Sequence, residues 1–333
     1  MSTDNFKHIP VMADEIIKYA KDVSVSGVMI DATLGGGGHS KLLLKARPND
    51  KLICFDRDEQ AIKAALENLN DFKDRFEIIH TGFADIGKEI RKRNLEGKVS
   101  VVLFDLGVSS HQLDKKERGF TYRVQDAPLD MRMDSRQQLT AEIIVNEYSE
   151  DELAKIIQKN GDEKFARKIA KKIVENRPIM TSGELIEIIR LAIPHKFQRL
   201  THPAKRTFQA LRIEVNAELD QLETALEESV HLLAPGGRVL VLSYHSGEDK
   251  IVKSIFSKYF HKEKSTKDGR LIPTIEDVNI NQFEGEVLRL IPTTRTPKKP
   301  SKDELEINRR SKSAKLRVVQ REENTDFNHA SGM

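Results

Sequence analysis

The chain has 333 residues, of which 38% are hydrophobic and 32% charged, so it can bury the core of one large soluble domain or two ordinary ones. It holds no run of about 18 or more apolar residues, no apolar signal core in residues 1–10 and one cysteine, Cys54; these absences exclude a transmembrane helix, a secretory leader, a disulfide framework and a cysteine-rich metal site, and favour a cytoplasmic protein without a metal. The net charge of +3 indicates no particular partner.

A glycine loop dominates the first part of the chain. Residues 31–40, DATLGGGGHS, join an apolar run at 27–30 to a helical pattern at 41–46. Strand, glycine loop and helix are the layout of a nucleotide-binding turn, because glycines let the backbone approach a ligand and the first helix amides then face it. A flexible turn that binds nothing is the alternative.

The second predicted strand ends in an acid. It spans residues 51–55 and is followed by Asp56, which lies 21 residues after Gly35. An acid at this place can accept hydrogen bonds from ribose hydroxyls. It can equally cap the helix that the apolar spacing predicts for residues 59–69.

Two further strands are predicted at residues 76–80 and 99–104, each after a helical pattern. Helices that alternate with near-continuous apolar strands predict an α/β fold, with a parallel sheet covered on both faces. Phe83 and Asp105 come shortly after these strands, where open sheets of this kind bind ligands. Phe83 can stack on a purine or pack in the core.

The alternation then stops, because helical patterns follow one another without strands. We expect residues 116–203 to form an inserted helical domain, and residues 1–115 and 204–333 to form one discontinuous domain around the sheet. Capping boxes at Ser149 and Thr181 begin two of the inserted helices. Another helix has a basic face that is either solvated or in contact with RNA. Its basic residues are Lys164, Arg167, Lys168, Lys171 and Lys172.

The chain returns to the sheet after the insertion. One helix is predicted from residue 204 to about residue 233, followed by a fifth strand at residues 238–243. Late strands near residues 287–290 and 315–319 are expected to be antiparallel neighbours. Segment 295–317 holds nine basic and three acidic residues. Such a segment can neutralise RNA phosphates, or it is a solvated tail.

The glycine loop departs from the dinucleotide fingerprint G-x-G-x-x-G. Counted from Gly35, the third glycine would stand where the chain has Ser40. The loop fits S-adenosylmethionine better, because that cofactor has no pyrophosphate. It needs close approach of the backbone, an acid for the ribose and a flat apolar surface for the adenine, and the loop, Asp56 and Phe83 supply these in order. A nicotinamide-dependent oxidoreductase is the alternative.

Several long blocks of sequence are specific enough to indicate a family. They are residues 8–12, DATLGGGGHS at 31–40, FDRD at 55–58, FDLGVSSHQLD at 104–114, ERGFTYR at 117–123, APLDMRMD at 127–134, HPAKRTFQALRIEVN at 202–216, LAPGGRV at 233–239 and SYHSGEDKIVK at 243–253. From about residue 7 to about residue 320 the chain resembles the bacterial small-subunit (16S) ribosomal RNA cytosine-N4 methyltransferases of the H type.

The resemblance implies a fold, a cofactor and a substrate. The fold is the class I methyltransferase fold, a Rossmann-like and mostly parallel sheet with an inserted helical domain that recognises substrate. The cofactor is S-adenosyl-L-methionine, and the reaction methylates the exocyclic amine of a cytidine in the P-site decoding region of 16S rRNA. The partner is then 16S rRNA in the small ribosomal subunit, with no membrane and no metal, and a homodimer stays open.

The resemblance also assigns cofactor-binding residues to this chain. They are Gly37, Gly38, His39, Asp56, Phe83, Asp105 and Gln112. The chain departs from the family at Gly36, where some members have arginine, and at Gly247, where leucine is usual. Neither departure removes an implied cofactor contact, although Gly247 can loosen the loop that carries His245.

The sequence indicates the catalytic residues less clearly than the cofactor-binding residues. Amino-methylating enzymes often have an acidic or amide residue, two prolines and an aromatic after the fourth strand, but this chain has Asp105-Leu106-Gly107-Val108. The acceptor for the amine proton must therefore come from elsewhere in the site. The candidates are His245, Ser109, Ser110 and Ser246, each of which can instead serve only as a cap or in a turn. Two further alternatives remain: a non-enzymatic ribosome-assembly factor and a protein methyltransferase.

Overall fold

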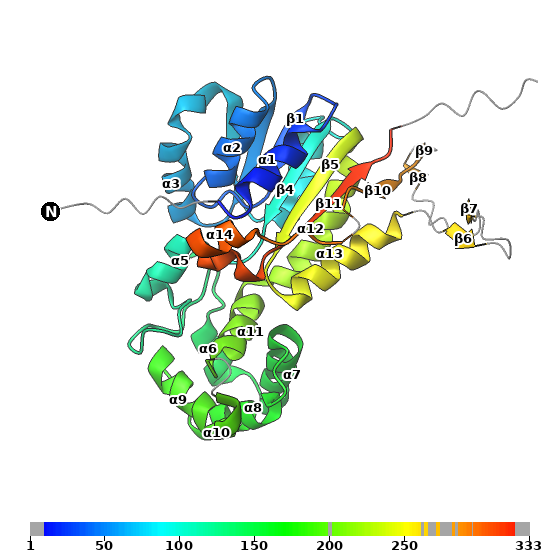
Figure 1. The fold of residues 1–333 in the computed structure, drawn as a ribbon. Coiled ribbons are helices and arrows are strands. Elements are labelled where there is room, and N and C mark those ends of the chain that lie inside the picture. The colour runs from blue at the N-terminus through cyan, green and yellow to red at the C-terminus, as the bar shows by residue number, and fades with distance from the viewer. Residues whose placement is uncertain are drawn as a thin grey trace, which may run out of the picture. The chain divides into compact units, whose positions relative to one another are not determined.

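The computed structural model describes residues 10–198, 202–260, 263–265, 271–273, 282–283, 286–294 and 296–323. The chain divides into two compact units (Figure 1). The sheet unit comprises the described residues of 1–56, 60–107 and 221–333, and the helical unit comprises those of 57–59 and 108–220. The domain boundaries expected at residues 116 and 203 stay a prediction; residues 108–115 and the described residues of 204–220 group with the helical unit by their contacts.

The sheet has the strand order β10-β11-β5-β4-β1-β2-β3. Its strands are β1 (Val28–Asp31), β2 (Lys51–Asp56), β3 (Phe76–His80), β4 (Val99–Asp105), β5 (Leu233–Ser243), β10 (Leu290–Pro292) and β11 (Lys315–Arg321). β1 to β5 pair in parallel, whereas β11 pairs antiparallel with β5 and with β10. The predicted mostly parallel α/β sheet with late antiparallel strands is confirmed.

Helices cover both faces of the sheet. They are α1 (Ala13–Lys21), α2 (Gly38–Ala46), α3 (Glu59–Asn68), α4 (Ile86–Lys92), α12 (Glu218–Leu232), α13 (Ser246–Lys258) and α14 (Lys302–Ile307). Neighbouring strand residues point to opposite faces, so Ile53 and Val102 pack in a buried cluster that contains residues of α4, α12 and α13. Leu52 and Leu103 pack in a second cluster, which contains residues of α1, α2 and α3.

The helical unit has its own hydrophobic core. Its helices are α5 (Ser110–Asp114), α6 (Ala141–Glu147), α7 (Glu150–Gly161), α8 (Ala166–Glu175), α9 (Ser182–Ala192), α10 (His195–Gln198) and α11 (Lys205–Asn216). Both predicted capping boxes are present, since Ser149 and Thr181 each exchange hydrogen bonds with the glutamate three residues later.

The helix predicted from residue 204 to about residue 233 is wrong in one respect, because it is two helices. Ala217 has a left-handed backbone (φ 47°) and separates α11 from α12. The side chain of Asn216, which ends α11, accepts from the amide of Met133 (2.8 Å) and donates to the carbonyl of Met131 (2.8 Å). These bonds fix the end of α11 to a segment 83 and 85 residues earlier in the chain, a long-range effect that helical spacing does not reveal.

Short elements complete the description. They are the 3-10 helices at Asn70–Arg75, Phe83–Asp85, Lys116–Arg118 and Arg309–Ser313, and the two-stranded pairs β6 (Glu263–Ser265) with β7 (Leu271–Pro273) and β8 (Gln282–Phe283) with β9 (Glu286–Val287). No described helix combines the length and the apolar character needed to cross a bilayer.

Candidate active site

The candidate site is the carboxyl edge of the parallel strands in the sheet unit. β1, β2 and β4 end at Asp31, Asp56 and Asp105, and β5 ends at Ser243, just before His245. The carboxyl ends of parallel strands meet at one edge of a sheet, and ligands bind there in open α/β folds. The sheet edge therefore brings together three aspartates that lie far apart in the sequence.

Asp56 holds the glycine loop. Its Oδ2 accepts a hydrogen bond from the amide of Gly35 (2.8 Å), and the amide of Gly37 donates to the carbonyl of Leu34 (2.8 Å). Gly37 has φ +77°, and a Cβ there would lie 3.3 Å from the Cα of Ala65 in α3. The loop is thus folded tightly, and two of its amides are already bonded and cannot cradle a phosphate.

Asp31 and Ser40 close the two ends of the loop. The Ser40 hydroxyl donates to Asp31 Oδ2 (2.6 Å), and the Thr33 amide donates to Asp31 Oδ1 (3.1 Å). Asp31 is fully buried, and burial raises the pKa of its carboxyl group. Ser40, the residue that breaks the dinucleotide fingerprint, is therefore part of the structure of the loop. Thr33 also ties the loop to β4, because its Oγ1 accepts from the Asp105 amide (2.6 Å).

Asp105 is held from two sides. The Tyr244 hydroxyl donates to Asp105 Oδ1 (2.6 Å), and His39 Nδ1 lies 3.3 Å from Asp105 Oδ2. The other ring nitrogen of His39 lies 2.9 Å from the carbonyl oxygen of Val11. Asp105 keeps 25% of its side chain exposed, whereas His39 is buried at 7%. A carboxylate fixed by the buried His39 and the partly buried Tyr244 is thus accessible at the sheet edge.

The pKa values of both partners of Asp105 are raised. Burial alone lowers the pKa of His39, but the hydrogen bond and the charge of Asp105 outweigh burial and raise that pKa. Burial, followed by the charge of Asp105, raises the pKa of Tyr244 well above its usual value, so its hydroxyl stays a donor at neutral pH. No sequence motif singles out Tyr244, although its position directly after β5 places it at the same edge.

Phe83 packs in the core of the sheet unit. Its ring meets the ring of Phe104 edge to face, with centroids 5.9 Å apart. The side chain is partly buried and joins the cluster formed with α4, α12 and α13. The structure thus gives Phe83 a packing role, and its stacking on a purine stays a prediction.

His245 caps α13. Its Nδ1 accepts from the amides of Gly247 (3.2 Å) and Glu248 (3.4 Å), so the ring proton lies on Nε2. Nε2 is 3.0 Å from Glu248 Oε1 but makes no hydrogen bond of good geometry. Glu248 completes a capping box, and Ser246 is the first residue of the helix. The catalytic roles of His245 and Ser246 stay predictions.

The remaining predicted residues belong to the helical unit. The Ser109 amide donates to Gln112 Oε1 (2.9 Å), and Ser109 Oγ accepts from the Gln112 amide (3.2 Å), so Ser109 is placed to cap α5. The backbone of Ser110 begins α5, and its side chain lies outside the described part of the chain. The catalytic roles of both serines stay predictions.

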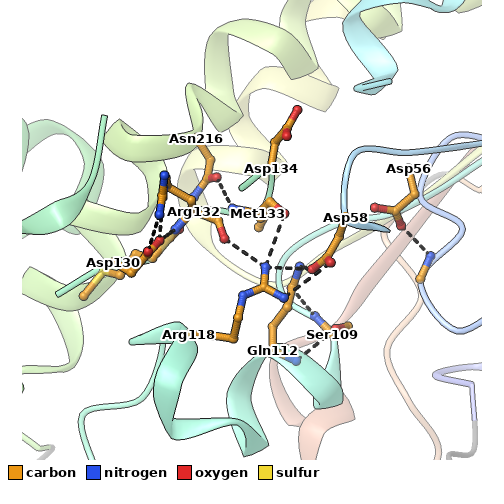
Figure 2. A network of polar contacts seen from close by, with 12 residues as sticks. Asp56, Asp58, Ser109, Gln112, Arg118, Asp130, Arg132, Met133, Asp134 and Asn216 are labelled. Carbon is orange, nitrogen blue, oxygen red and sulfur yellow. Dashed lines mark hydrogen bonds and ion pairs between the residues drawn. The ribbon is translucent and has the colours of Figure 1, made fainter. Parts of the chain in front are cut away.

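Gln112 contacts the largely buried ion pair between Asp58 and Arg118 (Figure 2). Its Nε2 donates to Asp58 Oδ2 (2.9 Å), and the guanidinium of Arg118 contacts both oxygens of Asp58 (2.8 and 3.3 Å). Arg118 also donates to the carbonyls of Arg132 (2.9 Å) and Met133 (3.2 Å). Asp58 and Arg118 were not predicted as site residues, although both stand in sequence blocks that indicate the family.

The basic segment 295–317 is folded where the structure describes it. Lys315 and Arg317 lie in β11 and bind Asp249 of α13 (3.0 and 2.8 Å). Glu304 of α14 accepts from the amide of Met12 (2.7 Å). A purely solvated tail is therefore wrong for the described residues of this segment, and its contact with RNA stays a prediction. Arg295 lies outside the described residues. Among all the residues that the structure describes, no group of three or more His, Cys, Asp or Glu side chains could hold a metal ion.

Comparison with known proteins places the chain in a family. Residues 5–322 match the model of the MraW methylase family. The chain is 48% identical over 320 residues to ribosomal RNA small subunit methyltransferase H of Clostridium botulinum (strain Kyoto), covering 95% of this chain and 99% of that protein. It is 48% identical to ribosomal RNA small subunit methyltransferase H 2 of Agathobacter rectalis, covering 95% and 98%.

A solved structure is similar at low identity. An rRNA methylase from Streptococcus thermophilus has a TM-score of 0.40 and 12% identity, over 92% of this chain and 94% of that one. The family match and the sequence identities carry the assignment. The chain belongs to the MraW methylase family.

Proposed function

We propose that the enzyme transfers a methyl group from S-adenosylmethionine to N4 of a cytidine in the P-site decoding region of 16S rRNA. The names of its relatives support ribosomal RNA of the small subunit as the substrate. The cytidine amine and the P-site position follow from the resemblance of the sequence blocks. We also propose that the reaction takes place in the cytoplasm.

The observation that carries the proposal is the acidic strand edge with its fixed Asp105. A sulfonium cofactor is cationic, and it suits an edge that bears Asp56 and Asp105. A pyrophosphate is anionic and needs backbone amides, yet the amides of Gly35 and Gly37 are already bonded. The donor set thus fits S-adenosylmethionine and argues against a nicotinamide dinucleotide.

We assign the cofactor contacts to one set of residues. They are Gly37, Gly38, His39, Asp56, Phe83, Asp105 and Gln112. A Cβ on Gly38 would lie 2.9 Å from Pro10 Cγ, so this glycine also keeps α2 close to the N-terminal segment. Asp56 would accept from the ribose hydroxyls while it anchors the loop. Asp105, oriented by His39 and Tyr244, would attract the positive charge.

When bound, S-adenosylmethionine supplies an electrophilic methyl group. The cytidine amine is conjugated with its ring and is a poor nucleophile, so the residues of the site contribute mainly by placing it in line with that methyl group. The amine proton must leave to an acceptor. His245, Ser109, Ser110 and Ser246 remain the proposed candidates for this step.

Labelled cofactor tests the proposal directly. Purified enzyme would be incubated with small ribosomal subunits and with naked 16S rRNA, and the RNA digested to nucleosides. We expect label in N4-methylcytidine, and loss of that label with Asp105→Ala. Label in another nucleoside, or recovered only in ribosomal protein, would contradict the proposal. Unlabelled RNA, with protein that is folded and binds the cofactor, would favour a non-enzymatic assembly factor.

A further inference from the structure

The helical unit has a cluster of exposed cations on α7, on the start of α8 and on the turn between them. These five residues, which we call the basic patch, are Lys155, Lys159, Lys164, Arg167 and Lys168. They line two hollows of about 370 and 240 Å³, which share Gln158 and Arg167 in their walls. Figure 1 shows α7 and α8 as neighbours, and many residues of the two helices are in contact.

Acidic side chains do not neutralise the cations of the basic patch. In the described ranges of the chain, none of its five cations lies in an ion pair. Only two carboxylates line the hollows, Asp151 and Glu163. Glu163 is buried, and its Oε1 accepts from the Phe165 amide (2.9 Å), so it serves the start of α8. The patch therefore carries excess positive charge.

The next turn of α8 behaves differently. Lys171 and Lys172 lie near Glu175, at 3.9 and 2.7 Å. The basic face expected from the sequence thus consists of two parts, one paired with an acid and one unpaired. A solvated face needs no such division, whereas unpaired cations gathered around hollows suit an anionic polymer.

Aromatic rings fix one member of the patch. Lys164 Nζ lies 3.7 Å from the ring centroid of Phe197 and 5.2 Å from that of Phe165. The two rings are 5.2 Å apart, and Lys196 Nζ lies 5.1 Å from Phe197. Cations beside aromatic rings are typical of surfaces that follow an RNA backbone and tolerate many base sequences.

We propose that the basic patch binds the phosphate backbone of the RNA that this enzyme methylates, without reading its bases. The inference rests on the proposed function for the identity of the RNA. An acidic protein segment is the competing partner. RNA is favoured because the cations surround two adjacent hollows and lie beside aromatic rings.

The test compares two double variants that remove equal charge. Lys159→Gln/Arg167→Gln removes two unpaired cations of the patch, and Lys171→Gln/Lys172→Gln removes two cations that are paired with Glu175. Binding of purified 16S rRNA and of poly(U) would be measured against salt concentration. Melting temperatures and cofactor affinity would show that both variants are folded.

We expect the patch variant to bind both RNAs roughly tenfold more weakly, and its log–log salt slope to fall by about 1.5. The control variant should keep the slope within error. An unchanged slope in the patch variant, or an equal loss in the control, would overturn the proposal. Competition by polyglutamate as strong as that by poly(U) would do so too. All these outcomes are measured as RNA binding. A failure of the methylation assay, which tests the proposed function, can therefore be distinguished from a failure of this proposal.

Discussion

At the scale of single residues, the best-defined feature is the pair of contacts on Asp105. His39 and Tyr244 approach separate oxygens of one carboxylate; His39 is buried and Tyr244 is partly buried. Neither needs to touch the substrate to matter, since they fix the direction of a charge that faces the proposed cofactor site. We therefore regard Tyr244 as a positioning residue.

Tyr244→Phe tests this role. Losing one hydrogen bond to a charged group should weaken cofactor binding about three- to tenfold, which corresponds to roughly 1 kcal/mol. Without that donor, Asp105 should interact more strongly with His39 and raise the pKa of His39 further, which an NMR titration would detect. Tyr259→Phe is the control, because its hydroxyl contacts Glu227 and not Asp105. An unshifted His39 pKa with normal cofactor affinity would remove Tyr244 from the site.

Asp56→Ala should have a larger effect. The substitution removes both the proposed ribose contact and the acceptor of the Gly35 amide. We expect cofactor affinity to fall about ten- to a hundredfold, with the fold intact. Calorimetry measures the affinity, and circular dichroism checks the fold. A folded variant with wild-type affinity would show that Asp56 does not bind the cofactor.

His245 can be tested for capping and catalysis at once. Asparagine can also cap a helix, so His245→Asn should keep the free energy of unfolding, while His245→Ala should lower it by about 1 kcal/mol. Because Nδ1 already accepts two amides, we expect His245→Asn to methylate within a few-fold of the wild-type single-turnover rate. A stable asparagine variant that is 10²–10⁴ slower, the range roughly expected for loss of a general base, would instead support the catalytic role.

At the scale of elements, α13 is tied to β11 by one acid. Asp249 contacts Lys315 and Arg317, two members of the basic segment. Burial alone raises the pKa of Asp249, but the hydrogen bonds from Arg317 and Lys315 outweigh it and hold that pKa below its usual range. The ionised form is therefore the one that stabilises the fold.

The lowered pKa of Asp249 predicts how the free energy of unfolding depends on pH. With the folded pKa below the usual value of 3.8, the stabilisation is present above about pH 4 and is lost as the pH falls through the folded pKa. Asp249→Asn should lower the free energy of unfolding by about 1–3 kcal/mol at neutral pH. Urea denaturation at several pH values measures this difference, with Asp74→Asn, a change at an exposed aspartate, as control. A difference that persists unchanged in acid would contradict the ionic origin.

Local signals predicted the elements well. Apolar runs located β1 to β5, and the capping boxes located the starts of α7 and α9, because both depend on residues close in sequence. Contacts between distant residues were not predictable in this way. The bond of Asn216 to Met133 splits a continuous helical pattern, and Tyr244 meets Asp105 only because β4 and β5 are neighbours. The pairing of Asp58 with Arg118 likewise spans 60 residues.

At the scale of the whole molecule, the two units carry opposite charge at their proposed binding surfaces. The sheet unit has an acidic strand edge that suits a cationic methyl donor. The helical unit has an unpaired basic patch that suits a polyanion. Each unit has its own buried core, so variants in one surface should leave the other function measurable.

Mapping of the modified nucleosides in 16S rRNA tests the central claim most directly. RNA from a strain that lacks this gene would be compared by mass spectrometry with RNA from the same strain carrying the wild-type gene or Asp56→Ala. We predict that one cytidine of the P-site decoding region lacks its N4-methyl group in the deletion, regains it with the wild-type gene and does not regain it with the variant. An N4-methyl group still present at that cytidine in the deletion strain, or a methyl group lost from a different base, would contradict the account.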